Sequence, residues 1–341
     1  MPIPQIERAA SEDAEGQRLD KFIRKWLPGV PLSHLYKLFR TRRIRVNAAR
    51  GYPETLLKSG DLVVVRGDEA DLLKPPPDPK SVKGGRTLRP SAIADAPLKV
   101  LFEDNVLLAI DKPSGLAVHP GSGIECATLV DLVRGYLGPR ATRNDFTASP
   151  AHRLDRDTSG VILVAKTRPC MVALTEMFTH GHPAKSYLAL AKGTCSKPRG
   201  VIDLPLAEHE QSGRSKALHG TNMQTAITRY RTLAAGSIAS LLECQIETGR
   251  THQIRRHLVA MGHPVAGDRR HGDFGFNREL KSRFGLKRMF LHARRISLKH
   301  PLTGEPLTIA APLPDELKAV LTAMGIAFDE TSPGASRPAS S

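Results

Sequence analysis

The most constraining feature of the sequence is a dense charged cluster that runs directly into a short apolar stretch. Residues 151–160 read Ala-His-Arg-Leu-Asp-Arg-Asp-Thr-Ser-Gly and bring three basic and two acidic side chains into six positions. The next five residues, Val161 to Ala165, are apolar and mostly β-branched, which is typical of a buried strand. We therefore expect the cluster to lie at the mouth of a core strand, on rigid support.

Asp155 is the residue of this cluster with the clearest chemical potential, because it stands between Arg153 and Arg156. A close opposite charge keeps a carboxylate ionised. An ionised carboxylate can act as a nucleophile or as a base. The alternative interpretation is a structural salt-bridge turn, since ion-pair networks also occur without catalysis.

The chain carries a large positive charge. It has 50 Lys and Arg residues against 34 Asp and Glu, which gives a formal net charge of +16. Such an excess favours a polyanionic partner, either a nucleic acid or an anionic membrane face. Aromatic residues make up only 5% of the chain, which argues against binding single strands mainly by aromatic stacking.

Several features indicate a cytoplasmic protein. No apolar stretch approaches the roughly 20 residues that a membrane span needs, and the N-terminus has no apolar signal core. Cysteines are few and far apart, and none forms a Cys-x-x-Cys pair, so we expect buried thiols rather than disulfides. The four cysteines are Cys126, Cys170, Cys195 and Cys244.

A small basic unit is predicted at residues 16–73. Apolar residues with helical spacing begin at Leu19 and end before Pro28, and Ser33 is expected to cap a second helix. Basic residues gather on the second helix and the turn after it: Lys37, Arg40, Arg42, Arg43 and Arg45. These residues suit a phosphate backbone, because each phosphate neutralised releases counterions. A solvated basic face is the alternative.

Composition divides the rest of the chain. We expect a flexible N-terminus at 1–15, a linker at 74–97 rich in Pro, Gly and Lys, and a disordered tail at 328–341. A second domain spans 98–327. Its short strands and amphipathic helices lie close together in sequence, which indicates an α+β fold. Residues 193–225 are expected to form irregular surface connections.

The charged cluster also resembles a family signature. His152 to Gly160 is similar to the signature of the RluA-type RNA pseudouridine synthases, in which the Asp after Arg-Leu is catalytic. Further stretches resemble other motifs of this family: Lys112-Pro113 with the loop after it, Lys185 to Ala189, Thr248 to Arg255, and Gly262 to Asp268. The chain departs from the family pattern at His271, where Tyr is common. The basic unit looks like an S4 RNA-binding domain.

The resemblance implies a fold, a reaction and a set of roles. The fold is a mixed, mainly antiparallel sheet with flanking helices and a cleft across its middle. In the reaction, the N1–C1′ bond of a flipped-out uridine breaks and a C5–C1′ bond forms. Asp155 would be catalytic, Arg250 would pair with Asp155, Tyr187 would pack on the base, and Arg153 and His152 would bind substrate. Attack at C1′, addition to C6 and removal of a ribose proton all stay open for Asp155. Lys112 would shape the cleft wall.

The implied reaction needs no cofactor and no metal. His252 and His257 are five positions apart rather than four, and no acidic or Cys cluster accompanies them, which argues against a zinc helix. The implied partner is large-subunit ribosomal RNA, naked or in an assembling particle. We expect a monomer without a membrane partner.

Two other functions fit parts of the sequence. A non-catalytic RNA-binding or ribosome-assembly factor would use only the basic unit, and it would not need Asp155, Tyr187 and Arg250. A glycosidase-like hydrolase could use Asp155 and Asp157, whose side chains would lie about 7 Å apart on an extended segment. Such a hydrolase would favour a neutral or acidic groove lined by aromatic residues, which a basic chain poor in aromatics does not suggest.

Overall fold

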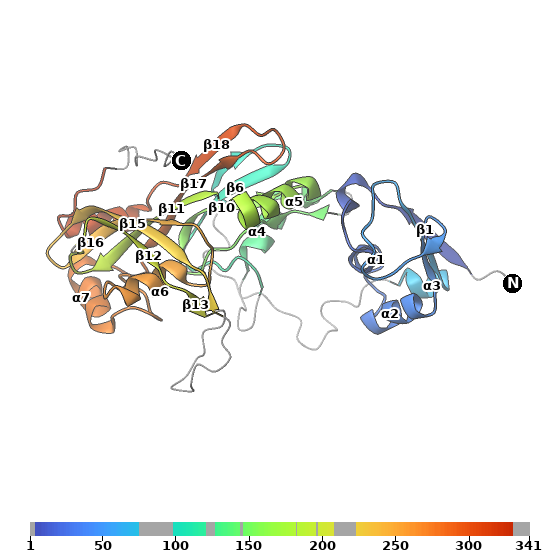
Figure 1. Cartoon of the computed structure of the whole chain (residues 1–341), viewed down its shortest axis with the longest axis horizontal. Coiled ribbons are helices and arrows are strands. Elements are labelled where there is room, and N and C mark those ends of the chain that lie inside the picture. The colour runs from blue at the N-terminus through green and yellow to red at the C-terminus, as the bar shows by residue number, and fades with distance from the viewer. Residues whose placement is uncertain are drawn as a thin grey trace.

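The computed structural model describes residues 4–74, 98–120, 127–143, 146–181, 183–195, 197–207 and 223–329. These residues form a small N-terminal unit and a larger unit that begins at residue 98 (Figure 1). Nearly all of the predicted linker and of the predicted tail lies outside the described residues.

The N-terminal unit is a four-stranded antiparallel sheet, with strand order β1-β4-β2-β3, packed against two helices. The apolar faces of both helices fill its core, where Phe22 and Leu35 are buried. Its elements are β1 (Gln5–Ala9), η1 (Glu12–Ala14), α1 (Leu19–Trp26), α2 (Leu32–Arg40), β2 (Ile44–Val46), β3 (Ala49–Arg50), β4 (Leu62–Arg66) and α3 (Glu69–Leu72).

The structure departs from two predictions for this unit. The described part of the stretch at 1–15, predicted to be flexible, contains β1, which pairs with β4 from Gln5↔Arg66 to Ala9↔Leu62. As an edge strand with half-exposed side chains, β1 carries too weak an apolar pattern to be recognised. Ser33 does not cap α2, because the helix already begins at Leu32, after Pro31.

The larger unit is built on a sheet that counts ten strands among the described residues. The main order is β12-β15-β16-β11-β17-β10-β6-β5, while β18 pairs with β17 and β9 with β10. Every described pairing is antiparallel except that of β10 with β17. The strands are β5 (Val100–Glu103), β6 (Leu107–Lys112), β9 (Ser149–Pro150), β10 (Ser159–Ala165), β11 (Ala184–Lys192), β12 (Arg199–Asp203), β15 (Ile227–Ala235), β16 (Ala239–Ile246), β17 (Leu291–Lys299) and β18 (Pro306–Ala310).

This mixed, mainly antiparallel sheet with flanking helices confirms the predicted α+β fold. One local prediction is wrong, because β12, β13 (Leu206–Ala207) and β14 (Met223–Gln224) lie within residues 193–225, which were expected to be irregular. β13 pairs with β14 outside the large sheet. A second small pair, β7 (Thr142–Arg143) with β8 (Phe146–Thr147), lies earlier in the chain.

Helices cover both faces of the sheet. On one face α4 and α6 pack over Ile162 and Tyr187, and on the other α5 packs over Leu163 while α7 and α8 pack over Leu188. Because neighbouring strand residues face opposite cores, the central strands are continuously apolar in sequence. The helices are α4 (Leu129–Leu137), η2 (Gly138–Ala141), α5 (Arg168–Glu176), η3 (Met177–Gly181), α6 (Gln253–Ala260), α7 (Phe274–Phe284) and α8 (Asp315–Ala323).

The parallel contact between β10 and β17 explains how the charged cluster ends. Gly160 pairs with Ala293 and has a φ of +114°, and a Cβ atom there would lie 2.1 Å from the carbonyl oxygen of Ala293. Only glycine allows this approach of the two backbones. The cluster therefore leaves the middle of the sheet as a turn before β10, as predicted.

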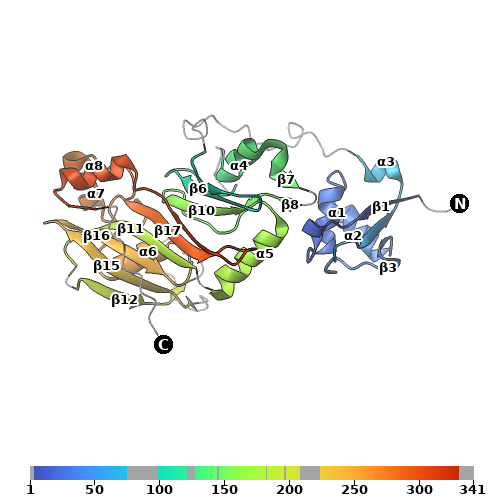
Figure 2. The same cartoon turned by 90° about the horizontal axis from the view of Figure 1, so that it is seen from above.

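The two units touch where α5 begins. The Nε atom of Arg168 donates to the carbonyl oxygen of Glu15 at 2.8 Å. The N-terminal unit lies at one end of an elongated molecule, and α7 and α8 lie toward the other (Figures 1 and 2). Among the described helices, none combines the length and the apolar character that a membrane crossing needs.

Candidate active site

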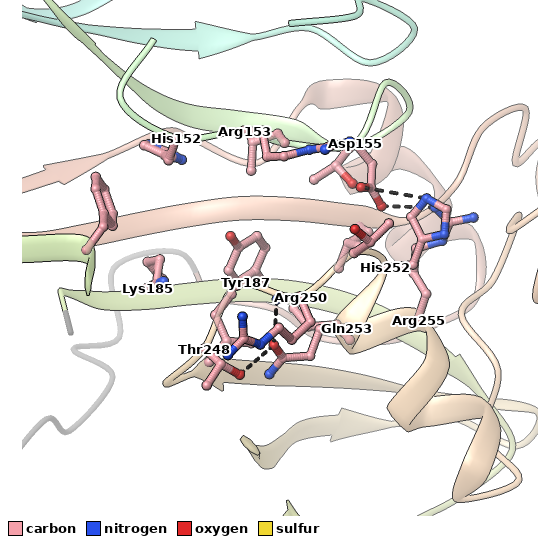
Figure 3. Close-up of a pocket in the computed structure, with 18 of the residues that line it drawn as sticks. His152, Arg153, Asp155, Lys185, Tyr187, Thr248, Arg250, His252, Gln253 and Arg255 are labelled. Atoms are coloured by element: carbon pink, nitrogen blue, oxygen red, sulfur yellow. Dashed lines mark hydrogen bonds and ion pairs between the residues drawn. The ribbon is translucent and has the colours of Figure 1, made fainter. Parts of the chain in front are cut away.

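A pocket of about 500 Å³ lies over the middle of the sheet and is lined by three motifs that are far apart in sequence. The turn at 151–158 contributes one wall, β11 contributes Lys185 and Tyr187, and the loop at 248–252 and the start of α6 close the third side (Figure 3). A second hollow of about 780 Å³ shares Asp155 and Arg255 with it and extends toward His119 and Arg269. Asp155 thus stands between two openings.

A guanidinium from α6 holds Asp155 in place. Arg255 donates from Nη1 to Asp155 Oδ2 at 2.9 Å, and from Nε and Nη2 to the two oxygens of Asp268 at 2.7 and 2.8 Å. The Asp268 side chain is 1% exposed, whereas that of Asp155 is 19% exposed. The buried carboxylate therefore fixes the guanidinium plane, and the plane orients the carboxylate that faces the pocket.

The contacts between Arg255 and Asp268 favour the charged forms of both side chains. Burial alone would lower the pKa of Arg255, but its hydrogen bonds to Asp268 and Asp155 raise that pKa above its usual value. Burial also opposes ionisation of Asp268, yet the Arg255 guanidinium and the backbone N–H groups of His271 and Arg270 lower the pKa of Asp268. Arg255 thus links a buried carboxylate to one that faces the pocket.

The predicted partner of Asp155 was Arg250, and this prediction is wrong. Arg250 is exposed at the pocket, where its Nε donates to the carbonyl oxygen of Thr225 at 3.2 Å. Nor does Arg156 hold Asp155, because Arg156 pairs with Asp157 at 3.2 Å. The reason is local: α6 begins at Gln253, so Arg250 belongs to the loop before the helix and Arg255 to its first turn.

Gln253 fixes the loop that precedes α6. Its side-chain oxygen accepts from Thr248 Oγ1 at 2.7 Å and from the backbone N–H of Arg250 at 3.1 Å, and its amide nitrogen donates to the carbonyl oxygen of Ile227 at 2.9 Å. Gln253 itself is only 3% exposed. The motif from Thr248 to Arg255 is therefore one rigid unit that carries Arg255 to Asp155.

Tyr187 lines the pocket from β11. It is 8% exposed, and Figure 3 shows it pointing from β11 toward the turn that carries Arg153 and Asp155. Burial, and the charge of Asp155 after it, raise the pKa of Tyr187, so the phenol stays protonated at neutral pH. A ring with a polar tip suits both packing and hydrogen bonding with a base.

Comparison with known proteins identifies the family of this chain. Residues 106–260 match the model of the RNA pseudouridylate synthases. Ribosomal large subunit pseudouridine synthase C of Escherichia coli (strain K12) is 38% identical over 320 residues, which cover 92% of this chain and 94% of the relative. The chain belongs to the RNA pseudouridylate synthase family. The namesake from Pasteurella multocida (strain Pm70) is 37% identical over 92% of both chains.

Solved structures of the synthase family agree. The human protein RNA Pseudouridylate Synthase Domain Containing 4 superposes with a TM-score of 0.56 at 26% identity and covers 67% of this chain and 94% of its own. A second human protein, RNA Pseudouridylate Synthase Domain Containing 1, gives 0.53 at 25% identity, covering 67% of this chain and 87% of that one. The resemblance inferred from the motifs is thus confirmed at the level of family and fold.

Two further residues of the synthase signature line the pocket. His152 accepts a hydrogen bond from the backbone N–H of Leu163 at 3.0 Å, and its ring lies 4.9 Å from that of Phe178. Burial lowers the pKa of His152 to about 3, so the ring is neutral at neutral pH. His152 therefore ties the turn to β10, while Arg153 borders both hollows. Their contact with substrate stays a prediction.

A histidine pair borders Asp155 on its other side. His252 lies in the left-handed region with a φ of 53°, and its Nε2 is 3.8 Å from Asp155 Oδ1. Its Nδ1 is 3.0 Å from Nε2 of His271, the position where the family commonly has Tyr. His271, at which the chain departs from the family pattern, thus contacts His252, which lies beside Asp155.

His257 has a structural role. It is fully buried and bonds through its two ring nitrogens to Thr228 Oγ1 at 2.9 Å and to the carbonyl oxygen of Leu204 at 3.0 Å. Within the described ranges, no group of three His, Cys, Asp or Glu side chains is arranged to hold a metal ion.

Sequence reasoning missed the roles of Arg255 and Asp268. Arg255 is the last residue of the Thr248 motif, so a signal for it existed, although the same motif also offers Arg250. Asp268 closes the Gly262 motif, but no charge pattern around it indicates a buried partner for a residue 13 positions earlier.

Lys112 supports the turn from behind. Its buried ammonium donates to the carbonyl oxygens of Pro113, Leu116 and Arg156 at 2.9, 2.9 and 3.0 Å. The backbone N–H of Gly115 also donates to Arg156, at 2.8 Å. This contact from the next strand of the sheet fixes the backbone beside Asp155.

Lys112 should make stability depend on pH. Burial lowers its pKa from 10.5 to about 7. Between those pH values the unfolded chain binds more protons, so this group adds stability as the pH rises. The free energy of unfolding of wild type minus that of Lys112→Met should therefore increase from pH 7 to pH 9.5, by at most about 1.4 kcal/mol per pH unit. Urea unfolding at several pH values measures this gain, and a pH-independent gap would contradict it.

Proposed function

We propose that this protein isomerises uridine to pseudouridine in the ribosomal RNA of the large subunit, with Asp155 as the catalytic carboxylate. The observation that carries the proposal is the meeting of Asp155, Arg255 and Tyr187 in one pocket of a chain similar over 92% of its length to ribosomal large subunit pseudouridine synthase C. The pocket lies open to solvent beside a turn, where a nucleotide pulled from its stack can enter.

Each side chain has a definable task in this reaction. The N1–C1′ bond breaks, the detached uracil turns, the C5–C1′ bond forms, and the proton at C5 is lost while N1 gains one. Asp155, oriented by its hydrogen bond from Arg255, acts on the ribose or on the base. Tyr187 packs on the uracil and keeps it in place while it turns. Arg153 can stack in the gap that the flipped nucleotide leaves, because a guanidinium plane stacks well on bases.

The N-terminal unit is proposed to be an S4 domain that binds the same RNA. Its five cluster residues, Lys37, Arg40, Arg42, Arg43 and Arg45, are exposed or half-exposed. In this unit Arg18 pairs with Asp20 and Lys74 with Asp71, but no described acidic residue pairs with the cluster. Exposed cations without an acidic partner suit a phosphate backbone. We further propose that the protein acts as a cytoplasmic monomer, on naked RNA or on an assembling particle.

Mapping of pseudouridine in ribosomal RNA tests the proposed function. Cells that lack the protein should lose the mark at specific large-subunit uridines, and the wild-type gene should restore it. An unchanged map would exclude this substrate. Release of free uracil from RNA by the purified protein, without pseudouridine, would instead show hydrolysis.

The basic cluster should determine how RNA binding depends on salt. Replacing Arg40, Arg42 and Arg43 with Gln should weaken binding and reduce the slope of log K against log salt by about 0.7–0.9 for each phosphate that the variant no longer neutralises. The matched control removes the same charge from α7 through Arg278, Lys281 and Arg283, all exposed at the far end of the molecule. Equal slopes for both variants would place the RNA elsewhere.

A further inference from the structure

Lys185 is a cation of the pocket that the reaction scheme does not use. It lies on β11 two residues before Tyr187, so both side chains point to the same face of the sheet and line the same pocket (Figure 3). Its ammonium is 5.6 Å from the centre of the Phe178 ring. Burial, the only cause acting on it, lowers the pKa of Lys185. The side chain thus loses hydration without gaining a negative partner.

No described acidic side chain pairs with Lys185. The two acidic residues that line this pocket are both engaged by arginines: Asp155 by Arg255 at 2.9 Å, and Glu247 by Arg229 at 2.7 Å. An ammonium withdrawn from water is costly unless an anion or several hydrogen bonds compensate it. The Phe178 ring compensates only in part, by about 0.5–2 kcal/mol.

The ammonium is only partly shielded, because Lys185 is half-buried and lines the pocket. Gly249 is exposed, and a Cβ atom built on it would lie 4.0 Å from Lys185 Nζ. The absence of a side chain at this position leaves the ammonium beside bare backbone at the edge of the pocket. An incoming group can therefore contact Lys185 while its neighbour rests on Tyr187.

We propose that Lys185 binds a phosphate adjoining the target uridine while Tyr187 packs on the uracil. This inference rests on the proposed function and adds a ligand group to the same site. Lys185 and Tyr187 are separated by two strand positions, about 7 Å. A ribose, which separates a base from its phosphate, spans a distance of the same order. Lysine binds phosphate as a point charge.

The environment favours a phosphate over an oxygen of the uracil. Lys185 lies on the Phe178 side of the pocket, and Figure 3 shows Tyr187 between Lys185 and Asp155. A neutral carbonyl group would compensate the buried charge less well than a full anion. Lys185 is therefore a substrate-binding residue that sets the position of the nucleotide backbone.

Uncharged phosphate analogues test the proposal. Three short RNAs each contain one target uridine. The first has normal phosphates on both sides of it, the second has a methylphosphonate on its 5′ side, and the third has a methylphosphonate on its 3′ side. Lys185→Met should bind the normal RNA about 10- to 100-fold more weakly than wild type, the range expected for a charge-assisted hydrogen bond. On the RNA that lacks the contacted charge, wild type and Lys185→Met should bind equally.

The controls separate folding, charge and chemistry. Lys185→Arg should retain most of the affinity, since it keeps the charge. Lys192→Met is the matched control, because Lys192 lies on the same strand, contacts the Phe276 ring and pairs with Asp273, outside the pocket. An equal loss for Lys185→Met on all three RNAs, or no loss on any, overturns the proposal. Product formed by wild type on the normal RNA shows separately whether the proposed function holds.

Discussion

Asp155→Asn is expected to abolish pseudouridine formation, with a loss of at least about 10⁴-fold in the single-turnover rate, because the amide can neither attack nor accept a proton. RNA binding should stay the same or become tighter. Asn keeps the shape of the side chain and an oxygen that can accept from Arg255, and the change removes a negative charge that faces a polyanion. Rates at saturating RNA and equilibrium binding separate the two effects.

Asp157→Asn is the matched control for this prediction. Asp157 lies two positions away, is 42% exposed and pairs with Arg156 at 3.2 Å, an exposed ion pair worth about 0–1 kcal/mol. Its replacement should change the rate by less than about 5-fold, the factor that corresponds to this energy. A similar loss for Asp155→Asn and Asp157→Asn would indicate a pair of carboxylates acting together, as in the glycosidase-like alternative. Full activity of Asp155→Asn would exclude Asp155 as the catalytic group.

The central strands and the turn at 151–158 could be predicted from sequence because their signals are local. Val161 to Ala165 is buried on both faces of the sheet, so its apolar run is continuous. Gly160 ends the charged cluster because two backbones meet there. Tyr187 lines the same pocket as Asp155, and its role toward the base stays a prediction that rests on the family resemblance. The edge strands β1 and β12 were missed, because half of their side chains face solvent and weaken the pattern.

The partner of Asp155 could not be predicted, because it depends on where a helix begins. The motif from Thr248 to Arg255 contains Arg250 and Arg255. Which of the two reaches the carboxylate of Asp155 depends on whether each arginine lies in the loop or in the helix. The choice follows from the left-handed conformation of His252, which turns the chain into α6 immediately before Gln253. Asp268, on which the orientation of Arg255 depends, is brought there only by the tertiary fold.

Arg255→Met is expected to lower the rate of pseudouridine formation by at least about 100-fold, because a catalytic group misplaced by about 1 Å costs that order of activity. Arg255 orients Asp155 through one hydrogen bond at 2.9 Å while two others fix it to Asp268. Arg250→Met should mainly weaken RNA binding, since among the described residues the Arg250 side chain bonds to the backbone carbonyl of Thr225 and not to Asp155. Rates at saturating RNA distinguish the two variants, and the reverse order would restore Arg250 as the partner.

Arg255→Met should also destabilise the fold, by about 3–5 kcal/mol, because the buried carboxylate of Asp268 loses its counter-charge. The double variant Arg255→Met with Asp268→Asn removes that charge as well. It should recover much of the free energy of unfolding, measured in urea, but not the reaction rate, because Asp155 still lacks its orienting donor. Arg255→Lys should restore stability in part and activity poorly, since an ammonium cannot donate in one plane to both carboxylates. Recovery of the rate by the double variant would mean that Arg255 acts through stability alone.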